Sequence, residues 1–153
     1  CVAAPLAGAA GSSAVDDKAR AQQITRSADQ ASTAGPVDYF TGQVRVDPLF
    51  AASEEINASG AYVTFAPGSR SAWHTHPAGQ RLVVVSGGGL TQEWGKPVQQ
   101  IHPGDVVVCP PGVKHWHGAA ADGAMTHLAV TGSVDGKSVT WMEKVTDEQY
   151  QNR

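Results

Sequence analysis

The sequence predicts an all-β fold, a single antiparallel jelly-roll barrel. Short apolar stretches follow one another from residue 60 to residue 145, and Gly, Pro, Asn or Asp separates them at short intervals. Regular short strands with such turn signals favour a barrel or sandwich over parallel βαβ units. The 17 glycines and 9 prolines suit a chain of many tight turns. The expected strands of the barrel are residues 61–65, 72–76, 80–86, 90–94, 98–101, 105–108, 114–118, 125–131 and 138–145.

The two ends of the chain differ from this pattern. Residues 1–22 are rich in Ala, Gly and Ser and poor in large apolar side chains, which predicts a flexible tail before a domain at 23–153. A short helix is expected to begin at Thr146. Three further elements are expected between tail and barrel, an edge strand at 24–27, a strand at 39–46 and an apolar plug at 48–50.

Composition narrows the class of protein. A chain of 153 residues with 41% hydrophobic content fits one domain with an adequate core. The net charge is −3 and no Lys/Arg cluster is present, so nucleic acid is not an expected partner. No apolar run reaches the length of a membrane-spanning helix, so no transmembrane segment is expected.

The two cysteines do not make a disulfide framework. Cys109 ends an apolar strand and is expected to be a small buried residue. Cys1 precedes a tract of small residues, which is compatible with a lipidated or exported protein of the bacterial periplasm or cell envelope. The alternative is a cytoplasmic protein whose given sequence simply starts there, and both interpretations stay open.

Two stretches of the chain carry residues that bind metals. His74 and His76 are two apart on an expected strand, so their side chains share one face, and Gln80 opens the next strand. His115 follows a second strand and a Pro-Gly turn. Three imidazoles and one amide oxygen suffice to hold a divalent ion inside a barrel. The absence of a thiolate in this set suits Mn, Fe, Ni or Zn.

The spacing of these residues resembles the paired motifs of the cupin superfamily, in the stretches 68–87 and 104–119. Two positions depart from the usual motif, with Gln80 in place of an acid and Ala119 in place of Asn. Segments such as WHTHPAGQ, PPGVKHWHGAA and MTHLAV are similar to bacterial manganese-dependent cupins with (R)-selective hydroxynitrile lyase activity. In that group the glutamine is normal, so the departure at Gln80 supports the resemblance.

The resemblance implies a cofactor, a substrate and roles for individual residues. The ion would be Mn²⁺, held by His74, His76, Gln80 and His115. The substrate would be an aromatic cyanohydrin, or an aldehyde plus cyanide. A substrate cavity would be lined by Ala61, Val63 and Thr131. A neutral ligand in place of glutamate leaves the full divalent charge in the pocket, which favours a bound anion or developing oxyanion.

The remaining histidines divide into expected site residues and an expected surface residue. His127 alternates with Leu128 and Val130 on its strand, so it is expected to face the cavity and to act as the general base. An unperturbed imidazole titrates near neutrality, which suits this role. The alternative is an outward histidine bonded to a backbone carbonyl. His117 shares a face with His115 and is expected to orient a ligand or line the pocket, whereas His102 is expected to face solvent.

The expected function is therefore a metal-dependent lyase that cleaves or forms α-hydroxynitriles such as mandelonitrile. Two alternatives use the same pocket. One is a dioxygenase-type oxidoreductase with Mn or Fe, and the other is a non-catalytic cupin that binds a sugar or another small molecule. We expect a homodimer or homotetramer, because the strands expected between 24 and 46 leave exposed edges.

Overall fold

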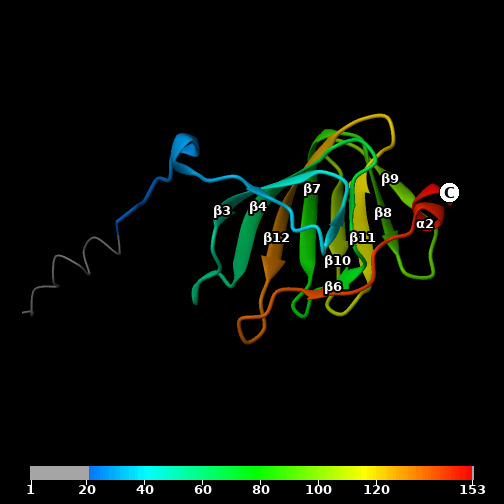
Figure 1. Ribbon diagram of the computed structural model, residues 1–153. Coiled ribbons are helices and arrows are strands. Elements are labelled where there is room, and N and C mark those ends of the chain that lie inside the picture. Colours follow the sequence, from blue (N-terminus) through cyan, green and yellow to red (C-terminus); the bar gives the residue numbers. More distant parts are fainter. Residues whose placement is uncertain (1–20, 153) are drawn as a thin grey trace, which may run out of the picture.

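The computed structural model describes residues 21–152, and their strands form two antiparallel sheets, which confirms the predicted all-β jelly roll (Figure 1). Almost all of the regular structure is strand, with one short α-helix. The first sheet has the order β1 (Thr33–Ala34), β3 (Val44–Phe50), β4 (Ala58–Phe65), β12 (Met125–Gly132), β7 (Gln80–Gly87), β10 (Val106–Cys109). The second has the order β13 (Thr140–Trp141), β6 (His74–Thr75), β11 (His115–Ala119), β5 (Arg70–Ser71), β2 (Phe40–Thr41), and β8 (Gly89–Glu93) pairs with both β11 and β9 (Gln99–Ile101).

Strand β12 lies at the centre of the first sheet, between β4 and β7. Its residues alternate strictly between buried and half-buried, as expected for a strand with one face toward a core. His127 and Thr131 both fall on the buried face. The alternation in the sequence therefore places these two polar side chains in the interior.

Apolar side chains pack in two clusters, one on each side of the second sheet. Phe40, Phe65 and Met125 belong to the cluster between the two sheets. Trp73 and Trp116, which alternate with the histidines of β6 and β11, belong to the other cluster together with residues of the C-terminal segment. Both tryptophans are buried in this outer cluster.

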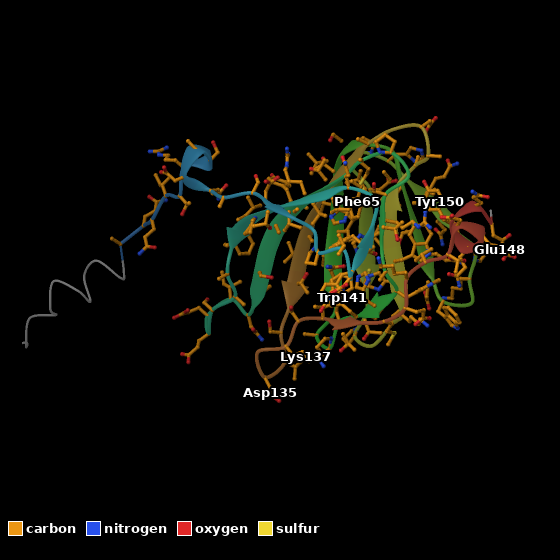
Figure 2. The ribbon with its side chains drawn as sticks, in the orientation of Figure 1. Phe65, Asp135, Lys137, Trp141, Glu148 and Tyr150 are labelled. Carbon is orange, nitrogen blue, oxygen red and sulfur yellow. The ribbon has the colours of Figure 1, made fainter. Side chains whose placement is uncertain are left out.

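The C-terminal helix α2 (Asp147–Gln151) covers this outer cluster. Thr146 caps it, because its hydroxyl accepts from the Gln149 amide while the Gln149 side chain accepts from the Thr146 amide. Figure 2 labels Tyr150 beside α2, where its hydroxyl donates to the carbonyl of Ala119 over 2.7 Å. The predicted helix start at Thr146 is confirmed.

Two predicted elements before the barrel are wrong. Residues 24–27 form no strand; a 3-10 turn, η1 (Ser27–Asp29), lies there instead, on a segment that extends away from the sheets (Figure 1). Residues 24–27 pair with no strand of either sheet, and the first strand of the described chain is β1 at Thr33–Ala34. Pro48 to Phe50 form the end of β3 rather than a plug, and the Phe50 ring covers Gly60 on the neighbouring strand.

Three predicted strands are shorter than expected. The strand at 39–46 breaks at Gly42, which has a φ of 85° that favours glycine. Only His74–Thr75 and Thr140–Trp141 pair within the strands expected at 72–76 and 138–145. The chain after β12 runs along the ends of the strands toward α2 (Figure 1). On the way, Thr140–Trp141 pair with β6, and Met142 and Glu143 hydrogen-bond to the backbone of Trp73.

Several predictions fall partly outside the described residues. Cys1 and most of the predicted tail lie there, and the domain boundary at residue 23 stays a prediction. Cys109 is buried as expected and is not in a disulfide. His102 is exposed as expected. Within residues 21–152, no helix is long and apolar enough to cross a membrane.

Candidate metal centre and cavity

The pairing of strands brings six predicted site residues to the space between the two sheets. In the second sheet, His74 on β6 lies directly opposite His115 on β11, and His117 is two residues further along the same face. In the first sheet, Gln80 on β7 lies opposite Thr131 on β12, and His127 is four residues before Thr131. All six side chains are buried. The site is therefore built from both sheets, across the interior of the barrel.

Three histidines form the tightest part of this group. One ring nitrogen from each of His74, His115 and His117 lies within 4.8 Å of the others, a spacing that can hold a metal ion. His76 follows β6 and lies beside this trio, with its ring centroid 4.9 Å from that of His74 and 5.3 Å from that of His115. The sequence interpretation placed His117 next to the ligands, and the structure brings it into the compact group.

The predicted histidine ligands share one feature that His117 lacks. Each has its Nδ1 atom on a backbone carbonyl, which can only accept a hydrogen bond, so each Nδ1 carries the proton and each Nε2 carries a lone pair. Such bonds set the tautomer and orientation of metal-binding histidines. The distances are 2.8 Å from His74 to Ala72, 2.7 Å from His76 to Ser138 and 3.1 Å from His115 to Val113.

Several of the ligand atoms are buried without a partner. The Nε2 atoms of His76 and His115 and the Oε1 atom of Gln80 have no hydrogen bond. Gln80 donates from Nε2 to the Thr131 hydroxyl over 3.0 Å, which leaves its oxygen free. Unpaired buried polar atoms are rare in folded proteins and need an explanation. A cation among these lone pairs supplies one, so the residues present fit a bound divalent metal.

Burial keeps the histidines of the site neutral. It is the largest cause lowering the pKa of His74, His76 and His117 below the ordinary value of 6.5. It also lowers the pKa of His115 to about 4. Neutral imidazoles are the form that binds a metal, because protonation would occupy the lone pair.

His117 and His127 form a hydrogen-bonded pair. The Nε2 atom of His127 lies 2.9 Å from the Nδ1 atom of His117, so one proton lies between the rings. The outer nitrogens, Nε2 of His117 and Nδ1 of His127, are buried without a partner. Burial lowers the pKa of His127 to about 4, so the expectation that it titrates near neutrality is wrong. The alternative of an outward His127 on a backbone carbonyl is also wrong, because the side chain is fully buried against His117.

A cavity of about 580 Å³ opens onto this site. Val63, His117, His127 and Thr131, four of the predicted site residues, line it together with three of the predicted ligands. Ala61 is not among the residues that line the cavity; it borders a second hollow near Phe50. The full lining consists of Thr33, Ala34, Pro36, Tyr39, Phe40, Val46, Ser59, Val63, His74, His76, Gln80, His117, His127, Ala129, Thr131, Ser138, Val139 and Trp141.

Aromatic side chains that the sequence interpretation missed form one wall of the cavity. Trp141 stacks on Tyr39 with ring centroids 4.7 Å apart, and its ring centroid is 4.8 Å from that of His74. Phe40 meets the edge of the Trp141 ring at 5.5 Å. These residues come from segments about 100 residues apart, so no local pattern could have indicated that they meet.

Comparisons with known proteins agree with this geometry. A family model described as a cupin domain matches residues 61–131. An (R)-mandelonitrile lyase from Granulicella tundricola is 59% identical over 128 residues, which are 84% of this chain and 98% of that protein. A solved cupin-like protein from Thermotoga maritima has 42% identity and a TM-score of 0.73, over 78% of this chain and 90% of that one.

A more distant structure shares the fold alone. The polyketide cyclase RemF from Streptomyces resistomycificus is 12% identical, with a TM-score of 0.65 over 86% of this chain and 92% of that one. Taken with the matched domain and the strands of the barrel, these similarities define the class: the chain belongs to the cupin superfamily. Within the superfamily it is close to proteins of the hydroxynitrile lyase kind, such as the Granulicella relative.

Proposed function

We propose that this protein is a metal-dependent lyase that cleaves and forms α-hydroxynitriles, with mandelonitrile giving benzaldehyde and HCN and with preference for the (R) enantiomer. The observation that carries the proposal is the set of buried, unpaired ligand atoms beside a neutral histidine pair in one apolar cavity. The 59% identity to a protein named (R)-mandelonitrile lyase supports the same substrate class.

The proposed ligands are His74, His76, Gln80 and His115, and the proposed ion is Mn²⁺, with Fe, Ni or Zn as alternatives. Backbone carbonyls orient the three imidazoles. The Thr131 hydroxyl accepts a hydrogen bond from the side-chain nitrogen of Gln80. When bound, such an ion supplies Lewis acidity toward a hydroxyl or carbonyl oxygen. His117 stays outside the proposed ligand set because its Nδ1 faces His127 rather than a carbonyl.

The histidine pair is the proposed site of proton transfer. Because two neutral imidazoles share one proton, one outer nitrogen carries a lone pair and the other carries a hydrogen. His127 acts as the general base when its Nδ1 carries the lone pair, and it takes the proton of the substrate hydroxyl as cyanide leaves. The pair then returns a proton to cyanide, so that HCN is released. The lowered pKa of His127, about 4, keeps its imidazole unprotonated at neutral pH, and it makes the protonated ring a strong proton donor toward cyanide.

The apolar lining of the cavity favours an aromatic substrate. Phe40, Val63, Ala129 and Trp141 give it a largely apolar lining, and the histidines and Gln80 of the proposed metal site also line it. An apolar pocket with a few convergent polar groups is typical of small-molecule binding sites. A phenyl ring against the apolar wall leaves the hydroxyl and nitrile of a cyanohydrin to face the histidines.

The test is an assay of purified, Mn²⁺-loaded protein with (R)- and (S)-mandelonitrile, in which benzaldehyde release is followed by its ultraviolet absorbance. We expect release from the (R) enantiomer well above the uncatalysed rate and slower release from the (S) enantiomer. Oxygen consumption is recorded in the same samples. Consumption of oxygen without benzaldehyde release from the cyanohydrin would contradict the proposal and favour the oxidoreductase alternative.

A further inference from the structure

We infer that Thr131 is a positioning residue that holds the side-chain amide of Gln80 with its oxygen toward the metal. The inference rests on the metal site of the proposed function. It adds a residue that makes no direct bond to the ion. Its evidence is the geometry of two neighbouring strands.

Gln80 and Thr131 are cross-strand neighbours. Gln80 opens β7, Thr131 lies near the end of β12, and the two residues stand directly opposite each other in the register. Their side chains are buried, with 6% and 8% of the surface exposed, and the Gln80 Nε2 atom donates to the Thr131 Oγ1 atom over 3.0 Å. No other acceptor for this amide nitrogen lies among the described hydrogen bonds.

The two ends of an amide are not equivalent to a cation. The oxygen offers lone pairs, whereas the nitrogen offers only hydrogens and cannot be a ligand in its neutral form. The ligating orientation therefore directs the Nε2 hydrogens away from the ion, into a buried position where they need an acceptor. The Thr131 hydroxyl is that acceptor. A side chain without an oxygen at residue 131 would leave the amide nitrogen buried and unpaired whenever the oxygen bound the metal.

This arrangement is a consequence of having glutamine rather than glutamate at residue 80. A carboxylate has two equivalent oxygens, so either can face the ion and no acceptor is needed behind it. A glutamine ligand needs a partner that accepts. The pairing of β7 with β12 thus places Thr131 where its hydroxyl can accept from Gln80 while the Gln80 oxygen faces the metal.

The experiment measures the affinity of metal-free protein for Mn²⁺, by competition with a fluorescent chelator, in wild type and three variants. Thr131→Val removes the hydroxyl at nearly constant volume, and Thr131→Ser keeps it. Thr126→Val is the matched control, because Thr126 lies on the same strand and its hydroxyl meets Thr64, away from the metal site. The melting temperature of each metal-free protein is measured in parallel.

We expect Thr131→Val to weaken Mn²⁺ binding by about 10- to 100-fold, with Thr131→Ser and Thr126→Val within about threefold of wild type. The melting temperature shows whether metal-free Thr131→Val is folded, so that a loss of affinity is separated from a loss of folding. Should Thr131→Val not fold, Thr131→Ala removes the same acceptor and is judged by the same thresholds. Wild-type affinity in the variant that lacks the hydroxyl would overturn the inference and leave the proposed lyase function intact. Failure of wild-type protein to bind Mn²⁺ would instead overturn the proposed metal site.

Discussion

The Nε2 atom of His127 lies 2.9 Å from the Nδ1 atom of His117, deep between the two sheets. The Phe65 ring packs against both imidazoles, in a T-shaped contact with His117 and a tilted contact with His127, with centroids 5.8 Å and 5.4 Å away. Neither imidazole has another hydrogen-bond partner among the described residues for its outer nitrogen. The hydrogen bond and the Phe65 ring therefore fix the two imidazoles relative to each other, beside the proposed metal site.

Replacement of His127 by alanine tests the role of this histidine pair in proton transfer. We expect His127→Ala to lower kcat for mandelonitrile cleavage by about 10²- to 10⁴-fold, the usual contribution of general acid–base catalysis. The metal content should not change, because His127 is not a proposed ligand. Benzaldehyde release and metal analysis by mass spectrometry are measured on the same preparation.

The matched control is His102→Ala, since the side chain of His102 is 65% exposed and lies outside the cavity. Its activity should equal that of wild type. Full activity of His127→Ala would show that His127 does not transfer the proton.

Exchange of Gln80 for glutamate tests the role of the neutral ligand. A carboxylate at this position cancels one unit of the charge of the ion. We expect Gln80→Glu to bind Mn²⁺ at least about tenfold more tightly, since charge–charge interactions at short range are strong in buried sites. Cyanohydrin cleavage should become slower, because a less positive centre stabilises a developing oxyanion less well. Tighter binding together with unchanged or faster cleavage would show that the neutral ligand has no bearing on the reaction.

The buried histidines make the stability of the metal-free protein depend on pH. Burial lowers the pKa of His115 and of His127 to about 4 in the folded protein, whereas the unfolded chain has the ordinary value of 6.5. Between these values the unfolded chain binds protons that the folded protein does not, so the free energy of unfolding falls as the pH falls from about 6.5 to 4. Each histidine contributes up to about 3 kcal/mol, fully present above pH 6.5.

Urea titrations of chelated protein between pH 7.5 and pH 4.5 measure this dependence. His127→Ala should make the slope shallower than in wild type, and His102→Ala should leave it unchanged. A free energy of unfolding that stays constant across this range would mean that the histidines are not held neutral by burial.

A buried hydrogen bond from the Tyr150 hydroxyl to the Ala119 carbonyl joins the C-terminal helix to β11. The Arg70 guanidinium also lies over the Tyr150 ring, 4.6 Å from its centroid. We expect Tyr150→Phe to lower the free energy of unfolding by about 1–3 kcal/mol, because the Ala119 carbonyl is left unpaired in the interior. Urea denaturation measures the change. Glu148→Gln on the exposed side of α2 should differ little from wild type, and equal stability of all three proteins would show that the bond contributes nothing.

Much of the site could be predicted from the sequence because its determinants are local. Two histidines at i and i+2 share a strand face by geometry alone, and a Pro-Gly turn sets where His115 begins the next strand. The tautomers could not be predicted in this way. They depend on the carbonyls of Ala72, Val113 and Ser138, and every residue type carries the same carbonyl.

The features that could not be predicted from the sequence depend on packing between distant parts of the chain. Ile24 belongs to a stretch with the composition of a strand, but the stretch pairs with no strand of either sheet and is exposed. Trp141 reaches the cavity because two residues of its segment pair with β6, a contact between distant parts of the chain. The lowered pKa of His127 likewise follows from its complete burial, which the sequence indicates only as a choice of strand face.

In the proposed function, cleavage depends on a divalent ion held by His74, His76, Gln80 and His115. The most direct measurement is (R)-mandelonitrile cleavage by the protein before chelation, after exhaustive chelation and after addition of one equivalent of Mn²⁺, with metal content determined at each stage. We expect cleavage to fall to the uncatalysed rate when the metal is removed and to return when Mn²⁺ is added. Undiminished cleavage by protein shown to be free of metal would mean that the reaction does not need the ion.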